Sequence, residues 1–181
     1  MKISVFTGDS EPGLDQYVRE IFRSWGLPLC ESSDSQGASG LDPHSTPVAI
    51  ALPGVDGSLS ELLLDYINRG GSLVSFLPTG ILVDAAGLKF TGEKETPLRL
   101  RLPREPVAGL AGELLPVVGR AGNYEVIGES VQACGYLSIP GRFHGETVGV
   151  AETPVGRGRI VAIAFDLPLS VLLCRQGDPA H

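Results

Sequence analysis

The chain has few lysines, and negative charge predominates. Only Lys2, Lys89 and Lys94 among its 14 basic residues are lysines, and 21 acidic residues give the 181-residue chain a net charge of −7. Surfaces that bind nucleic acid or anionic membranes need clustered basic side chains, because their phosphate contacts release counterions. The charge balance therefore argues against both partners, and we expect neither a nucleic acid nor a membrane to be bound.

Cysteines are also scarce, and long apolar runs are lacking. Cys30, Cys134 and Cys174 are widely spaced and form no CxxC pair, which argues against a zinc ribbon or a redox pair. No apolar run approaches the roughly 20 residues of a membrane-spanning helix. The opening segment Met1–Phe6 is too short for the apolar region of a signal peptide. We therefore expect a cytoplasmic protein with reduced thiols.

The composition is that of a globular domain. Hydrophobic residues make up 43% of the chain and charged residues 19%, far from the composition of disordered segments. A length of 181 residues suits a single domain with a substantial core, so we expect one domain over residues 1–181. The run Leu172–Cys174 leads into Arg175–Pro179 without a terminating element. We therefore expect this domain to have been excised from a longer polypeptide, or to dock its end onto a partner.

The first half alternates between apolar runs and helical patterns. Ser58 and Glu61 fit a capping box at the start of one helix, and Gly70 and Gly71 end it. The polar segment 32–47 reads as a surface loop. Short strand–helix–strand connections imply right-handed crossovers and a mostly parallel sheet with helices on both faces. The predicted strands cover 2–7, 27–30, 48–52 and 72–77, and the predicted helices cover 14–25, 58–69 and 81–86.

From about Glu93 the pattern changes to short β-segments. Leu98, Leu100 and Leu102 alternate with two arginines, which is typical of a half-exposed strand. We expect the segment 93–153 to be a β-rich elaboration packed against the main sheet. Further strands are predicted at 114–118, 124–127, 132–139, 147–152 and 160–165, with a hairpin turn at 155–158.

Two stretches carry a resemblance to a known superfamily. They are Gly-Gly-Ser-Leu-Val-Ser-Phe-Leu-Pro-Thr-Gly at 70–80 and Val-Gly-Arg-Gly-Arg-Ile-Val-Ala-Ile-Ala-Phe-Asp at 155–166. Together they resemble class I glutamine amidotransferase-like domains of the β-galactosidase trimerisation-domain and ThuA-like type. The resemblance implies an α/β fold, a flavodoxin-like three-layer sandwich with a mostly parallel central sheet, here with a β-rich elaboration in the C-terminal half. It also implies, as in several such proteins, a supporting role beside a carbohydrate-active domain.

The catalytic triad of that superfamily does not carry over. In true amidotransferases the strand matching 72–77 ends in a sharp elbow that presents a cysteine, whereas the elbow here reads Ser75-Phe76-Leu77-Pro78-Thr79-Gly80. A histidine and a glutamate should follow to activate the nucleophile. Only His144 and His181 follow, and the one His-x-Glu pair, His144-Gly145-Glu146, has no cysteine at the elbow to activate. We therefore expect no catalytic residues, no enzyme activity and a catalytically degenerate member.

Polar residues follow several predicted strands, and these are the candidate ligand-binding residues. Parallel sheets bind ligands at the carboxyl ends of their strands, where carboxylates and hydroxyls could hold a cation or sugar hydroxyls. The alternative is structural, with these groups capping helices and ordering turns. A second alternative makes Ser75 or Thr79 the nucleophile of a divergent hydrolase. The candidate ligand-binding residues are Asp9, Ser10, Asp56, Thr79 and Asp166.

Three functions follow from these observations. The first is a non-catalytic module that supports assembly or an adjoining domain, with self-association or that domain as its partner. The second is a small-molecule binder, with a saccharide as the expected ligand. The third is the divergent Ser/Thr hydrolase. We expect no cofactor and no metal site, because His44 and His144 lack further ligands at useful spacing.

Overall fold

The computed structural model describes residues 3–8, 14–24, 26, 29–31, 35–103, 113–141 and 145–176. The helices are α1 (Leu14–Ser24), α2 (Ser35–Ser39), α3 (Gly57–Asn68), α4 (Ile81–Ala85) and α5 (Leu167–Gln176). The first five strands are β1 (Ile3–Phe6), β2 (Leu29–Glu31), β3 (Val48–Ala51), β4 (Ser72–Phe76) and β5 (Leu88–Lys94). The remaining strands are β6 (Leu98–Arg101), β7 (Leu114–Val117), β8 (Ala121–Val126), β9 (Gln132–Ser138), β10 (Thr147–Val155) and β11 (Gly158–Ile163). Among these described helices, none is both long and apolar enough to cross a membrane.

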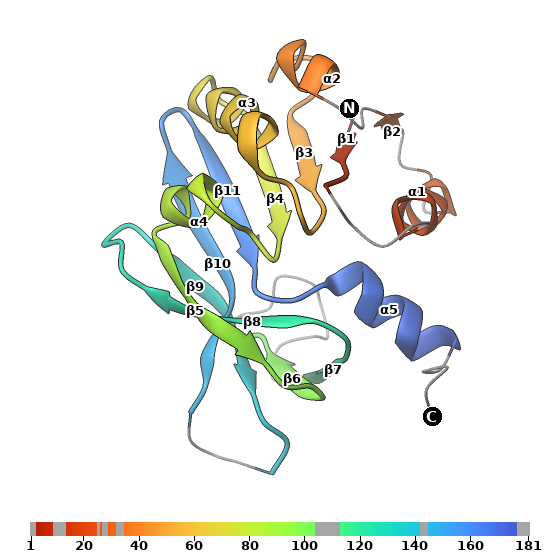
Figure 1. Ribbon diagram of the computed structural model, residues 1–181, viewed down its shortest axis with the longest axis vertical. Helices are drawn as coiled ribbons and strands as arrows, with labels where there is room; N and C mark the ends of the chain where they lie inside the picture. The colour runs from red at the N-terminus through yellow and green to blue at the C-terminus, as the bar shows by residue number, and fades with distance from the viewer. Residues whose placement is uncertain are drawn as a thin grey trace.

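A nine-stranded mixed sheet forms the centre of the molecule (Figure 1). Its order is β2-β1-β3-β4-β11-β10-β9-β6-β7, and the first five strands pair in parallel. The order 2-1-3-4-last of these five strands is that of flavodoxin-like sheets, so this part of the fold was predicted correctly. The other four strands join by antiparallel pairing.

The prediction of a mostly parallel sheet was wrong for the sheet as a whole. Strands β10, β9, β6 and β7 extend the parallel sheet edge to edge, instead of packing against its face. Of the strands that the structure describes, only β5 and β8 lie outside this sheet, and they form a separate two-stranded antiparallel ribbon. The alternation of polar and apolar residues in these antiparallel strands fits the arrangement, because an antiparallel sheet can keep one face in solvent.

Helices cover both faces of the parallel strands. Successive residues of each buried strand point to opposite faces, so one strand supplies two cores. On one face, Val18 of α1 belongs to a core formed with Ile3, Val5, Ile50, Leu52 and Phe76. On the other face, α3 contributes buried residues to a larger core; these include Leu63, Tyr66 and Ile67, packed with Ala49, Ala51 and Leu73. This part of the molecule is a three-layer sandwich.

Several local predictions need correction. The N-cap of α3 is Asp56, and no side chain caps this helix, so the capping box of Ser58 and Glu61 does not form. The predicted loop 32–47 contains α2, and both β5 and α5 lie where the sequence suggested no regular element. The glycine end of α3 was predicted correctly, since Gly70 has a φ of 115°, a conformation that favours glycine.

Candidate functional site

A strained turn joins β4 to α4 at the carboxyl edge of the parallel strands. Leu77 has a φ of 45°, and its amide donates to the carbonyl of Ile163 on β11 at 2.8 Å. A bulky non-glycine residue with positive φ is uncommon and costs on the order of 1 kcal/mol. Pro78, Thr79 and Gly80 complete the turn before α4 begins. The chain thus makes a strand-to-helix elbow, and the residue with the strained conformation is an apolar leucine.

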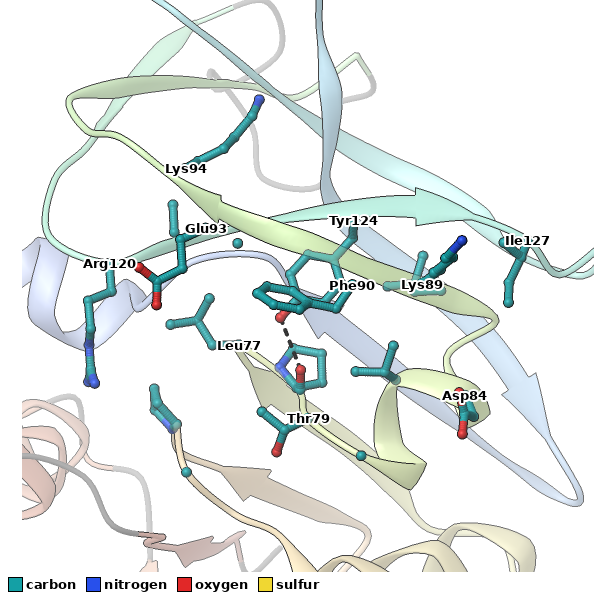
Figure 2. Close-up of a pocket in the computed structure, with 18 of the residues that line it drawn as sticks. Leu77, Thr79, Asp84, Lys89, Phe90, Glu93, Lys94, Arg120, Tyr124 and Ile127 are labelled. Carbon is teal, nitrogen blue, oxygen red and sulfur yellow. Dashed lines mark hydrogen bonds between the residues drawn. The ribbon is translucent and has the colours of Figure 1, made fainter.

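This elbow forms one wall of a cavity of about 650 Å³, which we call the crevice. Its other walls come from the loop after β3, from α4 and from the β5–β8 ribbon (Figure 2). A volume of this size can hold a drug-sized molecule. The residues with side chains around the crevice are Pro53, Leu77, Pro78, Thr79, Val83, Asp84, Leu88, Lys89, Phe90, Glu93, Lys94, Arg120, Ala121, Tyr124 and Ile127.

An ordered aromatic pair from the ribbon lines the crevice. The rings of Phe90 and Tyr124 lie 5.4 Å apart at 60°, and the Tyr124 hydroxyl donates to the Pro78 carbonyl at 3.0 Å. Burial raises the pKa of Tyr124, so this hydroxyl remains a neutral donor. Tyr124 is buried, whereas Phe90 is 48% exposed. The pair ties the ribbon to the elbow and leaves part of an aromatic ring open to solvent.

Five charged side chains line the crevice, three of them cationic. Lys94 donates to the Thr147 hydroxyl at 2.6 Å, and partial burial lowers the pKa of its ammonium. Lys89, Asp84 and Glu93 are exposed on the rim. Both signs of charge therefore face the same space.

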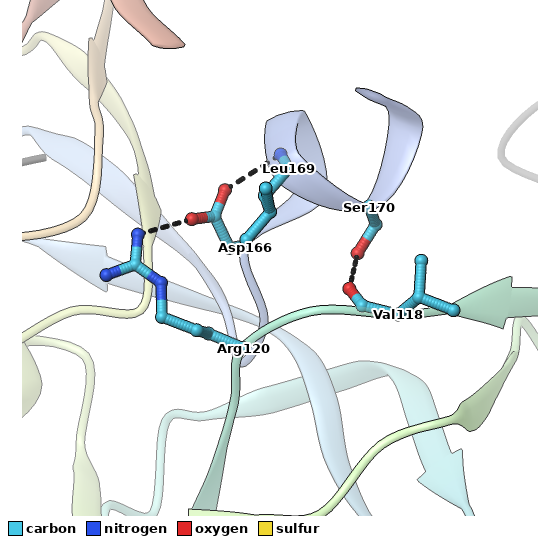
Figure 3. A network of polar contacts seen from close by, with 5 residues as sticks. All are labelled: Val118, Arg120, Asp166, Leu169 and Ser170. Carbon is cyan, nitrogen blue, oxygen red and sulfur yellow. Dashed lines mark hydrogen bonds and ion pairs between the residues drawn. The ribbon is translucent and has the colours of Figure 1, made fainter. Parts of the chain in front are cut away.

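Arg120, the third cation, is held by a buried carboxylate (Figure 3). Its Nη2 donates to Oδ2 of Asp166 at 2.7 Å, and Oδ1 of Asp166 accepts from the Leu169 amide at 3.0 Å. Asp166 is fully buried, while the Arg120 side chain is 46% exposed. Asp166 thus caps the start of α5 and orients a guanidinium that lines the crevice.

The structure separates the residues that the sequence put forward as ligand-binding. Thr79 lines the crevice, where its hydroxyl donates to the Val55 carbonyl at 3.2 Å. Asp56 is the exposed N-cap residue of α3, and Asp166 is buried beneath Arg120; neither lines the crevice. Asp9 and Ser10 lie outside the described residues.

Sequence reasoning missed the ribbon side of the crevice. Lys89, Phe90, Glu93 and Lys94 come from β5, which was not predicted, and Arg120 and Tyr124 lie at or near β8. The pairing that brings Phe90 opposite Tyr124 joins segments over 30 residues apart, and no local motif marks it. The only signal in the sequence was Phe90, a single aromatic residue in a largely polar stretch.

Metal binding has no support in the described part of the chain, where no three His, Cys, Asp or Glu side chains group as a metal site. His44 is exposed in a turn near Asp42, and its amide donates to the Asp42 carboxylate at 3.2 Å. This hydrogen bond is the main cause of a lowered pKa of Asp42. His144 lies outside the described residues.

Neither a protein-family model nor a curated protein sequence matches this chain. Solved structures do share its fold at low sequence identity. A cytoplasmic protein of Salmonella typhimurium LT2 is similar over 92% of this chain and 88% of its own, with 11% identity and a TM-score of 0.66. A ThuA-like protein of Bacteroides uniformis ATCC 8492 is similar over 92% and 82%, with 13% identity and a TM-score of 0.63.

A third similar structure is part of a much larger enzyme. Gan42B, a GH42 β-galactosidase of G. stearothermophilus, is 14% identical over 90% of this chain, with a TM-score of 0.67. This chain spans only 27% of that enzyme's length. The fold therefore occurs both as a protein of similar size and as part of a glycosidase.

Proposed function

We propose that this chain is a non-catalytic amidotransferase-like module that supports assembly or an adjoining domain, with a carbohydrate-active enzyme as the expected neighbour. The observation that carries the proposal is Leu77. The strained elbow that presents a nucleophile in such folds is retained, but its side chain is an alkyl group that can neither attack nor transfer a proton. The glycosidase with the same fold supports the expected neighbour.

A hydrolysis assay tests the non-catalytic part. The chain should hydrolyse neither p-nitrophenyl acetate nor glutamine above the buffer rate, and Thr79→Ala should change nothing. Thr91→Ala is a matched control, because Thr91 also donates to a backbone carbonyl at 3.2 Å and does not line the crevice. Turnover that Thr79→Ala abolishes and Thr91→Ala preserves would make the chain a divergent hydrolase.

Exposed apolar residues on the ribbon and directly after it support the assembly part. Phe90 is 48% exposed, Val126 44% and Ile127 61%, at one end of the paired strands. Exposed apolar groups gathered in one place are typical of association surfaces. Light scattering should give a mass above that of the monomer, which Ile127→Asp lowers. Leu114→Asp, on β7 and also exposed, is the matched control. A strict monomer at all concentrations would count against self-association.

The second candidate function is small-molecule binding in the crevice, with a saccharide as the expected ligand. The specific observation is the 650 Å³ cavity with a partly open aromatic ring beside carboxylates and the Thr79 hydroxyl. Sugar rings stack their apolar face on aromatic rings and bond to carboxylates through their hydroxyls. A thermal-shift screen of sugars and divalent cations tests it, and silence across the panel would retire it.

The expected compartment is the cytoplasm. The widely spaced cysteines fit a reducing environment, and the similar Salmonella typhimurium LT2 structure is described as a cytoplasmic protein.

A further inference from the structure

Arg120 differs from the other charged groups of the crevice because a buried partner fixes it. Asp166 is fully buried and contacts Nη2 of the guanidinium, so the side chain is oriented from behind. Within the described residues no second partner contacts this guanidinium, and it is 46% exposed. Its remaining N–H groups are therefore free to donate. A guanidinium offers planar paired donors that match a carboxylate or phosphate, and prior orientation reduces the entropy lost on binding.

The wall next to Arg120 is apolar. Leu77, Pro78 and the half-exposed Phe90 face the same space. Figure 2 shows Leu77 and Phe90 between Arg120 at one end of the crevice and Lys89 at the other. Phe90 keeps its orientation because it packs on Tyr124, which is itself bonded to Pro78. A ligand with an apolar or ring-shaped part would bind more tightly by covering this surface, because apolar area would be removed from water.

Glu93 works against an anion at this position. It lines the crevice on the same side as Arg120, and no ion pair joins the two side chains (Figure 2). Its carboxylate lies in the same space, where it repels a second anion. Arg120 should therefore favour anion binding and Glu93 should oppose it. Neutralising the two residues should change the affinity for an anion in opposite directions.

We propose that the crevice binds an organic oxyanion, a carboxylate or phosphate joined to a ring with an apolar face, with the oxyanion on Arg120 and the ring on Phe90 and Leu77. The proposal rests on the second candidate function and names the ligand class of that site. Lys89 and Lys94 add positive charge to the same cavity. Because Arg120 is about half exposed, added salt weakens the attraction.

Calorimetric titration with matched pairs of probes tests the proposal: benzoate against benzamide, phenyl phosphate against phenol, and glucuronate against glucose. The anion of at least one pair should bind at least tenfold more tightly than its neutral partner. Arg120→Gln should weaken that anion tenfold or more, and Glu93→Gln should tighten it severalfold. Arg157→Gln is the matched control, since Arg157 is exposed in the β10–β11 turn and does not line the crevice.

Two further variants keep the test decisive if Arg120→Gln fails to fold around the uncompensated Asp166. Glu93 and Phe90 are exposed, so Glu93→Gln and Phe90→Ala should both fold. Phe90→Ala should weaken binding about tenfold. Neutral probes that bind as tightly as the anions, or affinity unchanged in Glu93→Gln, overturn the oxyanion assignment while small-molecule binding stands. Failure of every probe to bind the folded protein overturns both.

Discussion

The parallel and antiparallel parts of the molecule contribute differently to the crevice. The parallel strands supply the elbow around Leu77 and the turn after β3, which are mainly backbone, proline and aliphatic surface. The ribbon and the loop before it supply most of the charged and aromatic side chains, including Phe90, Glu93 and Arg120. The parallel part thus shapes the crevice, while the β-rich part gives it most of its charged and aromatic groups.

The two parts also differ in how freely their side chains can change. The parallel strands are buried on both faces, so their residues are fixed by packing and leave little freedom for new chemistry. The antiparallel ribbon keeps one face solvated, so its side chains can change at small cost in stability. A difference in ligand between proteins of this fold is therefore expected to arise mainly in the segment that matches β5–β8.

The largest expected effect is on stability, and it tests whether backbone packing holds the parallel part more rigidly than the antiparallel part. A Cβ on Gly158 of β11 would lie 2.1 Å from the Gly71 carbonyl oxygen and 2.5 Å from that of Ile67. A Cβ on Gly135 of β9 would meet only side-chain atoms, at 3.1–3.2 Å. Gly158→Ala should lower the free energy of unfolding by about 3 kcal/mol, and Gly135→Ala by about 1 kcal/mol. Urea denaturation measures both; equal losses would contradict the contrast.

A second, smaller effect concerns Tyr66, a buried tyrosine of the parallel part. Its hydroxyl donates to the Thr46 carbonyl at 2.8 Å, and burial raises its pKa to about 12. The folded state therefore holds this proton more tightly than the unfolded state. The associated stability is fully present below pH 10 and is lost as the pH rises towards 12, by at most about 2 kcal/mol.

Tyr66→Phe separates this titration from simple packing. At pH 7 the variant should lose about 1 kcal/mol, the contribution of a buried hydrogen bond. Between pH 10 and 12 it should lose less stability than the parent protein. Tyr124→Phe is the companion variant in the ribbon, because burial also raises the pKa of Tyr124. Denaturation midpoints across this pH range measure the effect, and parallel curves for parent and Tyr66→Phe would exclude it.

The sequence predicted the parallel part better than the rest for a physical reason. Strands β1 and β3 are buried at nearly every residue, and β4 and β11 are partly buried; continuous apolar runs mark such strands. Strand β5 has only Leu88 buried and a register shift between Phe90 and Gly92, so neither an apolar run nor a strict alternation marks it. A prediction that depends on hydrophobic period cannot find such a strand.

The residues of the candidate site were also predicted better where they follow a buried parallel strand. Thr79 and Asp166 were both proposed as ligand-binding residues because each follows a recognisable strand, and of the two only Thr79 lines the crevice. Asp166 caps the start of α5, as the structural alternative for this residue stated. The position of Arg120 over Asp166 depends on a contact between residues 46 apart, which strand pairing creates and local sequence does not encode.

The smallest expected effect compares two exposed ion pairs, one in each part. In the antiparallel part, Arg101 donates from Nε and Nη2 to the Glu146 carboxylate at 3.1 and 2.6 Å, and its guanidinium lies 5.4 Å from the centre of the Tyr136 ring. In the parallel part, Arg69 donates to Asp65 one turn earlier on α3 at 2.8 Å. Exposed pairs contribute little, because water screens them and ordering the side chains costs entropy.

The hydrogen bond from Arg101 lowers the pKa of Glu146, so its stabilisation is present above the ordinary glutamate value of 4.5 and is lost as the pH falls below it. Glu146→Gln should lower the melting temperature by less than about 2 °C at pH 7 and leave it unchanged at pH 3. Asp65→Asn should have a similarly small effect at pH 7. A loss of several degrees in Glu146→Gln alone would mean that this pair joins Arg101 of β6 to the segment before β10 cooperatively. The antiparallel part would then depend on polar contacts where the parallel part depends on packing.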